Sequence, residues 1–424
     1  MPESTLDIVI RDTLSRIKPS REERELLLDT FSRIKDAIIS CSSSFNMRRV
    51  VEGGSVAKDT FLSGDTDLDI FVQIETNTKK TLEKFTYLTA ECISKKIGNC
   101  KYQIAYAENP YTRLFIQENG KIIEADIVPI AFASNYEELK KALKISGMAR
   151  TPFHTEYAQK NLTESMKDEV RLLKYFMKQK RIYGIFGFTG WLCELLIIYY
   201  KKFLNVLHNA KNVVNLKIDL LGRFSEDEIR AKFPHDKIII IDPTDPDRNA
   251  AAGIQGFVGE IYLKRFIKST ELGLKEPKKL FEPIRPTGNI MVKFKIKSVE
   301  KALKENIITS IGRAANNLYR NLIKWEYVIE DLYILHDPPQ LYLKVNPFSK
   351  EYDLLVGPPI KLKQAVERFK EKHKEHEIII KDNRYYAKVP PRFPTAIDAV
   401  KYTLSMIKLK LFSDYSILDL SKNY

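Results

Sequence analysis

Two closely spaced aspartates have the residue type and spacing that metal chemistry needs. The segment VVEGGSVAKDTFLSGDTDLDIFVQ covers residues 50–73 and places Asp67 and Asp69 in an apolar stretch. Because side chains alternate along a β-strand, both carboxylates should lie on one face, with Leu68 and Ile70 on the other. Carboxylates this close repel each other unless a cation neutralises them, and Mg²⁺ prefers such hard oxygen ligands. We therefore expect a magnesium site at this segment.

A third acidic ligand is available in the stretch KIIEADIVPI, residues 121–130. Asp126 projects from an otherwise apolar strand, and burying its carboxylate without a partner would be costly. Glu124 shares that face and is the competing candidate. Asp65 alternates with the first two aspartates, but it lies in the SGDT turn. We expect Asp65 to cap the loop or to act on the site indirectly.

The GGS turn before these acids is suited to phosphate. Gly53 and Gly54 let the backbone approach a ligand closely, and Ser55 begins a short helix whose amide groups and hydroxyl can bind phosphate. Lys58 adds a cation one turn later. A GGS turn alone is usually only a turn, and spaced acids usually form an exposed strand face. Their combination in this order is more specific, and it differs from a P-loop because the chain has no G-x-x-x-x-G-K-[ST] pattern.

The elements that must position these residues follow from periodicity. Ser20 and Glu23 form a capping box at the start of a helix predicted over residues 20–42. The pattern after it predicts a helix at 79–96 and strands at 47–52, 67–74, 102–107, 112–117 and 122–130. This order indicates a compact α/β or α+β domain whose sheet is complete by about residue 135.

The rest of the chain changes in character twice. Helical spacing dominates residues 156–203, and a second capping box, Ser225 with Glu228, precedes the β-rich stretch KIIIIDP. Beyond about residue 275, the pattern changes to proline-punctuated loops and basic alternating strands such as VKFKIKS, LYLKV and EIIIKDNRYYAKV. We therefore expect a second, helical domain followed by a strand-containing C-terminal part.

The chain is basic, with a formal net charge of +14 and a pI near 9.2. A polyanionic partner would explain this charge, and a lysine-rich proteome would explain it equally well. Lys293, Lys295 and Lys297 should share one side of a strand, as a nucleic-acid surface or, more usually, a solvated sheet face. The basic helix near residues 361–374 is a second candidate surface for RNA.

Several classes of protein do not fit this sequence. The longest apolar run, residues 191–200, contains Glu194 and is much shorter than the roughly 20 residues of a membrane-spanning helix. The N-terminus MPESTLDIVIRD lacks the pattern of a secretory signal, so we expect a cytoplasmic protein with no membrane partner. The four cysteines show no C-x-x-C spacing, so we expect neither a zinc site nor a disulfide scaffold.

The acidic and glycine motifs resemble those of the DNA polymerase β-type nucleotidyltransferases, in which a GS turn, a D-x-D pair and a third aspartate hold two metals. Later motifs narrow this resemblance. In order, the chain contains ARTPFH (149–154), DEVRLLK (168–174), IYG (182–184), GFTGWLCELL (187–196) and DPTDPDRNAAA (242–252), with GPPI and AVERFKEKHKEH further on. Together these segments resemble archaeal class I CCA-adding enzymes over nearly the whole chain.

The resemblance implies an α+β multidomain fold. Its parts would be a polymerase β-like nucleotidyltransferase head at residues 1–140, a helical neck at 141–260, an α+β body at 261–308 and 376–424, and a tail at 309–375. The neck would recognise the nucleotide base, and the body and tail would grip the acceptor stem and T-arm of tRNA. Recognition of an RNA duplex by its shape and phosphates suits a broad basic surface.

The resemblance also implies roles for individual residues. Asp67, Asp69 and Asp126 would be catalytic and would bind two Mg²⁺ ions, with Asp126 holding only the ion that activates the RNA 3′-hydroxyl. The nucleotide would be bound by Gly54, Ser55, Lys58, His154, Lys174, Tyr183 and Arg248. Arginine is common in the family where this chain has Lys58, and lysine lacks the planar fork needed for a bidentate contact.

Arg248 would read the incoming base. Cytosine and adenine present an acceptor where uracil and guanine present a ring N–H, so an arginine, which only donates, favours the first two bases. Taken without the resemblance, Arg248 would be an arginine at a helix start, paired with Asp245 or Asp247.

The other neck residues also have ordinary explanations. Lys174 would be a solvated helix residue, His154 a polar histidine in a loop, and Tyr183 part of the core. Arg171 lies one turn before Lys174 and would either reinforce the phosphate site or form a salt bridge with a nearby acid.

The activity implied is CCA addition, the template-independent transfer of C, C and A from CTP and ATP to the tRNA 3′ end with release of pyrophosphate. The partners would be tRNA, CTP and ATP, and a homodimer is compatible with the resemblance. Two alternatives stay open. A poly(A) polymerase would use the same head chemistry with ATP alone, and a tRNA-binding protein with an inactive head would catalyse nothing, although the three intact aspartates oppose that interpretation.

Overall fold

The computed structural model describes residues 4–65, 67–106, 109–135, 138, 147–298 and 303–421. The chain divides into two compact units, Met1–Ile284 and Arg285–Tyr424. The division into head, neck, body and tail is finer than these two units and stays a prediction. Within the described ranges, no helix combines the length and apolar character needed to cross a membrane.

A five-stranded sheet forms the N-terminal part of the first unit, with the strand order β1-β2-β5-β4-β3. Strands β2 and β5 are parallel, and the other neighbours in this sheet are antiparallel. The elements are α1 (Thr5–Ile17), α2 (Arg21–Cys41), β1 (Met47–Gly53), α3 (Gly54–Ala57), β2 (Asp67–Ile74), α4 (Lys79–Ile97), β3 (Cys100–Tyr106), β4 (Pro110–Glu118) and β5 (Lys121–Ala131). Every helix and strand predicted here is confirmed within a few residues, whereas α1 was not predicted and Ala107 lies outside the described residues.

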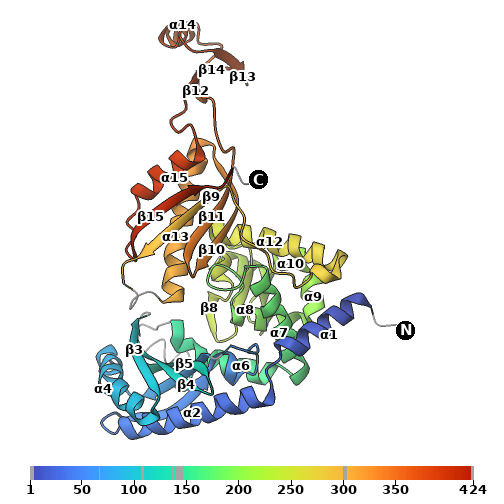
Figure 1. The fold of residues 1–424 in the computed structure, drawn as a ribbon. Helices are drawn as coiled ribbons and strands as arrows, with labels where there is room; N and C mark the ends of the chain where they lie inside the picture. Colours follow the sequence, from blue (N-terminus) through green and yellow to red (C-terminus); the bar gives the residue numbers. More distant parts are fainter. Residues whose placement is uncertain are drawn as a thin grey trace. The chain divides into compact units, whose positions relative to one another are not determined.

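Alternation along β2 decides which face of this sheet becomes the core. Leu68, Ile70 and Val72 are buried against helices α2 and α4, which lie together on one side of the sheet (Figure 1). Asp67 and Asp69 therefore face away from these helices. The predicted capping box of Ser20 and Glu23 begins α2, with both of its reciprocal hydrogen bonds formed.

A disulfide joins Cys41 at the end of α2 to Cys92 in α4, with the Cα atoms 6.0 Å apart. The expectation of no disulfide scaffold did not foresee this bond, and nothing in the sequence paired these two residues. Cysteine spacing along the chain could not reveal the bond, because it depends on the packing of α2 against α4, two helices separated by strands β1 and β2. Cys100 and Cys193 are free thiols.

Helices dominate the remainder of the first unit, as predicted for residues 156–203. They are α6 (Thr151–Asn161), α7 (Glu164–Gln179), α8 (Gly190–Tyr200), α9 (Phe203–His208), α10 (Ala210–Val213), α11 (Glu226–Lys232) and α12 (Gly256–Lys275). A small sheet of order β6-β7-β8 consists of β6 (Lys217–Asp219), β7 (Ile239–Asp242) and β8 (Asp245–Asn249). The predicted capping box of Ser225 and Glu228 begins α11.

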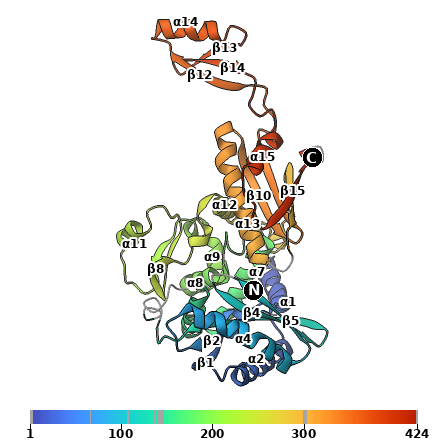
Figure 2. The same ribbon diagram turned by 90° about the vertical axis from the view of Figure 1, so that its left-hand side faces the viewer.

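The second unit contains two sheets. The larger has the order β10-β11-β9-β15, with α13 and α15 packed together against it, and the smaller has the order β12-β14-β13 and carries α14 (Figure 2). The elements are β9 (Ile290–Ile296), α13 (Lys304–Leu322), β10 (Val328–His336), β11 (Pro339–Asn346), β12 (Asp353–Pro359), α14 (Lys363–Lys372), β13 (Ile378–Lys381), β14 (Arg384–Val389), α15 (Ala396–Ser405) and β15 (Phe412–Asp419). Helices α13 and α15 were not predicted.

Strand β9 has the alternation expected for its lysines. Lys293, Lys295 and Lys297 are exposed, whereas Val292 and Phe294 are buried in the sheet core. The basic helix predicted near residues 361–374 is present as α14. The second unit therefore exposes both basic segments that were singled out as candidate surfaces for RNA.

Candidate active site

A row of paired residues crosses four strands of the five-stranded sheet, beginning where β1 ends at the GGS turn. Gly53 of β1 is paired with Asp69 of β2, Asp69 with Asp126 of β5, and Asp126 with Arg113 of β4. Because β2 and β5 are parallel and in register, Asp67 is likewise paired with Glu124. Paired residues in neighbouring strands share a face of the sheet. The fold thus brings the three predicted catalytic aspartates together on one face, with Glu124 beside them.

Gly54 is required by the position of the Asp69 carboxylate. Its φ angle is +70°, and a Cβ atom placed on it would lie 1.9 Å from Asp69 Oδ2. Only glycine satisfies both the left-handed backbone conformation and this close approach. Ser55 follows in the short helix α3, as predicted. The glycine turn therefore leaves room for the carboxylate of Asp69, a predicted catalytic residue, in addition to the phosphate-binding role expected from the sequence.

The pairing of Asp69 with Asp126 produces strong electrostatic repulsion. Burial raises the pKa of Asp69 to about 7, and the negative charge of Asp126 adds to this increase. Arg113 opposes the repulsion by donating from Nε to Asp126 Oδ1 at 2.7 Å and from Nη2 to Asp126 Oδ2 at 2.8 Å. This bidentate ion pair orients the Asp126 carboxylate.

A hairpin sets the pairing of Arg113 with Asp126. Asn119 and Gly120 both have positive φ angles, 48° and 75°, at the two-residue turn between β4 and β5. Asn-Gly is the preferred sequence for such a turn, and a two-residue turn fixes the register of its strands. Counting outward from this turn pairs position 113 with position 126. This sequence signal could have predicted the role of Arg113, which the sequence analysis missed.

The donor set at this site suits a divalent cation. Three carboxylates on one face supply hard oxygen ligands, and a cation would offset both the burial and the repulsion that raise the pKa of Asp69. The side chains are not arranged as a complete coordination sphere, since the described part of the chain contains no cluster of three or more His, Cys, Asp or Glu residues ready to hold a metal. A bound cation would have to share Asp126 with Arg113.

A second group of charges surrounds the buried carboxylate of Glu194 in α8. Its Oε2 accepts from Lys58 Nζ at 2.6 Å, and its Oε1 accepts from Lys174 Nζ at 3.0 Å and Thr60 Oγ1 at 2.8 Å. Burial acts to raise the pKa of Glu194, but Lys174 and Lys58 outweigh burial and lower it to about 2. Burial also lowers the pKa of Lys174, against the effect of Glu194.

Lys58 and Lys174 were both predicted to bind the nucleotide, and the fold brings them onto one carboxylate. Neither is a solvated side chain, since Lys58 is 7% and Lys174 3% exposed. Tyr183 lies close to them, because a Cβ atom on Gly190 would be 3.0 Å from Tyr183 Oη and 3.5 Å from Lys174 Nζ. Burial of the Tyr183 hydroxyl raises its pKa, although much of the ring is exposed.

The loop between the GGS turn and β2 is held by helix α7. Arg171 is buried and donates to the carbonyl oxygens of Asp59 and Phe61, and it forms ion pairs with the Asp59 and Asp168 carboxylates. The salt-bridge explanation of Arg171 is therefore confirmed. Asp65 accepts from Lys178 Nζ at 2.8 Å, so its side chain anchors the same loop to α7.

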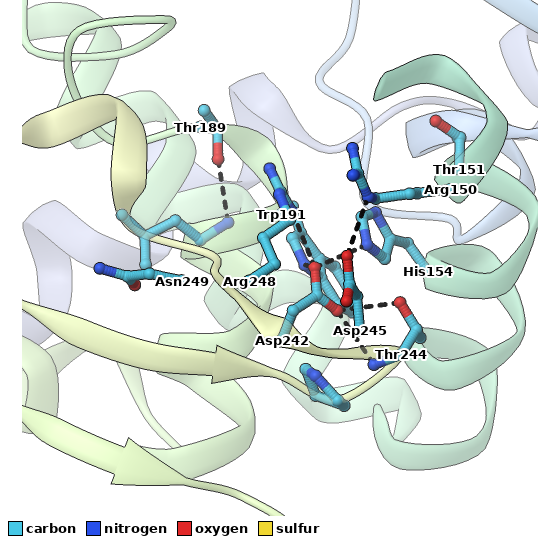
Figure 3. Close-up of polar contacts among 12 residues, drawn as sticks. Arg150, Thr151, His154, Thr189, Trp191, Asp242, Thr244, Asp245, Arg248 and Asn249 are labelled. Carbon is cyan, nitrogen blue, oxygen red and sulfur yellow. Dashed lines mark hydrogen bonds and ion pairs between the residues drawn. The ribbon is translucent and has the colours of Figure 1, made fainter. Parts of the chain in front are cut away.

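The third group of charges is centred on Asp242 at the end of β7. Its Oδ2 lies 2.7 Å from Arg248 Nη1, 2.9 Å from His154 Nε2 and 3.3 Å from Trp191 Nε1 (Figure 3). His154 also stacks on the Trp191 ring, with the ring centroids 4.2 Å apart. The fold thus brings together His154 and Arg248, two predicted nucleotide-binding residues from distant parts of the sequence.

Two ordinary explanations for these residues are wrong. His154 is a buried residue of helix α6 and not a polar residue in a loop. Arg248 lies in strand β8 and not at a helix start, and its partner is Asp242. The acids expected to pair with Arg248 have other partners, Arg150 for Asp245 and Lys232 for Asp247. The error arose because the DPTDPDRN stretch continues from β7 into a paired strand, a tertiary feature that its turn-forming residues conceal.

Two buried acids at these sites were missed. Glu194 was noticed only as an interruption of an apolar run, although a single acid in a buried helix needs a cationic partner and is itself a signal. Asp242 ends the apolar run KIIIID, where a carboxylate at the end of a buried strand carries the same signal. Neither residue reveals its partners from the sequence, because those partners come from other elements.

Comparisons with known proteins agree with this architecture. Residues 168–282 match the family model for the second domain of tRNA nucleotidyltransferases. A CCA-adding enzyme of Sulfurisphaera tokodaii is 33% identical over 413 residues, which cover 93% of this chain and 91% of the relative. A CCA-adding enzyme of Methanocaldococcus jannaschii is 30% identical over 420 residues, covering 94% of this chain and 90% of the relative.

A solved structure of the Cid1 poly(U) polymerase bound to MgATP has the same fold over part of the chain. It aligns with a TM-score of 0.50 and 13% identity, covering 66% of this chain and 100% of that chain. The fold is therefore that of the polymerase β-like nucleotidyltransferases. Since the two CCA-adding enzymes match along nine-tenths of its length at 30% identity or more, the chain belongs to the family of CCA-adding enzymes.

Proposed function

We propose that this protein adds C, C and A in turn to the 3′ end of tRNA, using CTP and ATP and releasing pyrophosphate. The observation that carries this proposal is the pairing of Asp69 with Asp126 across the parallel strands β2 and β5, with Asp67 on the same face and Gly53 of the antiparallel strand β1 beside Asp69. Catalysis of phosphoryl transfer requires positioned charges and no covalent nucleophile, which is consistent with a site built from carboxylates and cations.

The three aspartates would hold Mg²⁺, which when bound would lower the pKa of the RNA 3′-hydroxyl and offset the charge of the triphosphate. Asp126 would keep its orientation through Arg113. Gly54 would maintain the position of Asp69, and the amide and hydroxyl groups of Ser55 would meet a phosphate. The three aspartates and Arg113 already share one face of the sheet.

The nucleotide would lie between the aspartates and the neck residues. Lys58 and Lys174 would supply positive charge to the triphosphate from their shared site on Glu194, with Tyr183 beside them. Arg248 and His154 would contact the base. Both side chains are bound to the buried carboxylate of Asp242, which keeps their nitrogen atoms close together. The guanidinium would favour cytosine and adenine, which offer an acceptor to it.

The tRNA would be held through its acceptor stem and T-arm. The exposed lysines of β9 and the basic helix α14 are the proposed contacts, since phosphate neutralisation by lysine favours RNA binding without reading its sequence. A cytoplasmic location and a homodimer are compatible with this function and stay predictions.

The test is incubation of tRNA lacking CCA with Mg²⁺ and each nucleotide separately, followed by incubation with CTP and ATP together. We expect incorporation of CMP, then of AMP once two C residues are present, and a stop after three additions. Extension with ATP alone and without limit would instead identify a poly(A) polymerase. The Asp67→Ala variant should be inactive, and extension by it would refute the metal assignment. Incorporation of UMP as fast as CMP would refute base selection by Arg248.

A further inference from the structure

Asp242 has an unusually complete set of hydrogen bonds for a buried carboxylate. Its side chain is 0% exposed, and its Oδ2 faces nitrogen atoms of Arg248, His154 and Trp191. Its Oδ1 accepts from Thr244, from the backbone N at 3.0 Å and from Oγ1 at 2.9 Å. Both oxygen atoms are thus engaged from different sides, which leaves the carboxylate one orientation.

The position of this carboxylate is held by the backbone as well. Arg223 donates from Nη2 to the carbonyl oxygen of Asp242 at 3.1 Å and from Nη1 to that of Pro243 at 3.2 Å. Arg223 is itself paired with Asp219 in β6. The turn that carries Asp242 is therefore tied to the sheet, and the carboxylate is a rigid anchor.

Two side chains predicted to meet the nucleotide depend on this anchor. Arg248 donates one N–H group to Asp242, and its side chain is still 33% exposed. The other N–H groups of the guanidinium can therefore contact a ligand. Burial lowers the pKa of His154 despite the neighbouring Asp242, so its imidazole is neutral near pH 7. Because a carboxylate only accepts, Nε2 carries the proton and Nδ1 is left as an acceptor.

The anchor matters because discrimination between bases depends on direction. A guanidinium fixed in one orientation can donate a hydrogen bond to the ring nitrogen of cytosine or adenine. The ring N–H of uracil or guanine is also a donor, so the same guanidinium cannot bond to it. A freely rotating arginine would turn away from the N–H group of uracil or guanine. The unfavourable contact that excludes these bases would then be lost.

We propose that Asp242 is a positioning residue for base selection, which holds Arg248 and His154 in the orientation that accepts C or A and rejects U or G. The proposal rests on the proposed function, in which Arg248 contacts the base. Because the Asp242 side chain is fully buried, it would act on the substrate through the two side chains that it holds (Figure 3).

The test measures CMP and UMP incorporation separately, with the full-length protein, Mg²⁺ and tRNA lacking CCA. In Asp242→Asn the charge that holds Arg248 is lost, and we expect the ratio of CMP to UMP incorporation to fall by about tenfold or more, the value of one hydrogen bond to a charged group. Asp245→Asn is the matched control. Asp245 is a buried acid in the same turn that forms an ion pair with Arg150, and its replacement should leave the ratio unchanged.

A milder variant keeps the proposal testable if Asp242→Asn does not fold. Thr244→Val removes only the hydroxyl that donates to Asp242 Oδ1, so the carboxylate loses part of its orientation while every ion pair is retained. We expect a smaller loss of the ratio, about threefold, with nearly unchanged thermal stability.

A double-variant experiment separates this proposal from the proposed function. In an Arg248→Ala background, Asp242→Asn should lower the ratio much less than it does in the unaltered protein, because only His154 is left for Asp242 to position. Equal losses of CMP and UMP incorporation in Asp242→Asn, with the ratio preserved, would overturn the positioning role. If Arg248→Ala alone left the ratio unchanged, base selection by Arg248 would fail and the positioning role would fail with it, whereas CCA addition would stand.

Discussion

Arg113 donates two hydrogen bonds to Asp126, one to each carboxylate oxygen, across the hairpin of β4 and β5. Asp126 is in turn paired with Asp69 in the parallel neighbour β2. The arginine therefore occupies the carboxylate that the proposed metal would need, and it lowers the repulsion between the two acids. A protein cation and a metal ion are expected to share the charge of Asp126.

Replacement of Arg113 should make the protein depend more on Mg²⁺. In Arg113→Gln, the thermal midpoint in EDTA should fall because Asp126 loses its charged partner, a loss of about 2 kcal/mol. Added Mg²⁺ should raise the thermal midpoint of Arg113→Gln by more than it raises that of the unaltered protein. Arg33→Gln, which removes an ion pair between Arg33 of α2 and Glu118 at the end of β4, is the control and should show no extra response to Mg²⁺. An equal Mg²⁺ response in all three proteins would contradict the sharing of Asp126.

Replacement of Gly54 should displace Asp69. In Gly54→Ala, the new methyl group would clash with Asp69 Oδ2, and we expect nucleotide incorporation to fall roughly 100-fold, as for other small misplacements of catalytic groups. Gly64→Ala provides a matched control. Gly64 also has a positive φ, +84°, but has open space around it, so its replacement should cost about 1 kcal/mol of stability and retain activity. Comparable activities of the two variants would refute the positional role of Gly54.

Replacement of Glu194 should weaken nucleotide binding and stability together. Glu194→Gln leaves Lys58 and Lys174 buried without their counter-charge, so the free energy of unfolding should fall by roughly 3 to 5 kcal/mol. Because both lysines would lose their fixed positions, KM for CTP and ATP should rise. Glu169→Gln alters another carboxylate of the same region, one that accepts from the backbone of Phe203, and should leave KM unchanged. A Glu194 variant with normal KM would argue for a purely structural role.

The pH dependence of stability should report the charge of Glu194. Its pKa in the folded protein is about 2, below the ordinary value of 4.5. Between these values the unfolded chain binds more protons, so the contribution of Glu194 is complete above pH 4.5 and is lost as the pH falls toward 2. Denaturant unfolding of the unaltered protein and Glu194→Gln should show a difference that is constant from pH 5 to 7 and shrinks below pH 4.5. A constant difference down to pH 2.5 would contradict this assignment.

The lysines of β9 should contribute to tRNA affinity through charge. Replacing Lys293, Lys295 and Lys297 together by Gln should weaken tRNA binding and reduce the slope of log K against log salt by about 2, as expected for three lost phosphate contacts. The control replaces Lys79, Lys80 and Lys84 of α4, a helix on the sheet face opposite the aspartates. If the slope of log K against log salt were unchanged in the triple lysine variant, these lysines would be solvent-exposed residues that do not contact tRNA.

Local pattern alone was sufficient to predict most of the N-terminal sheet. Periodicity located β1 and β2, and alternation correctly placed Leu68 in the core and Asp67 and Asp69 on the opposite face. Capping boxes located the starts of α2 and α11 because the capping hydrogen bonds join residues only three positions apart. The basic face of β9 followed from the same alternation. These features depend on neighbours in the chain.

The resemblance to CCA-adding enzymes brought in residues that no local pattern would have selected. Lys174, His154 and Arg248 each have an ordinary explanation when taken singly, and the ordinary explanations of all three are wrong in the fold. Their surroundings are what distinguish them, since each is held by a carboxylate from another element.

The sequence by itself determined the strand faces, the helix starts and the shared face of Asp67 and Asp69, because these depend on the two-residue and 3.6-residue repeats of the backbone. Only the tertiary structure decided the partners of the buried charges. Arg113 holds Asp126, Glu194 holds two lysines, and Asp242 holds Arg248 together with His154. A buried charge must find a partner, but which residue becomes that partner depends on how distant elements pack.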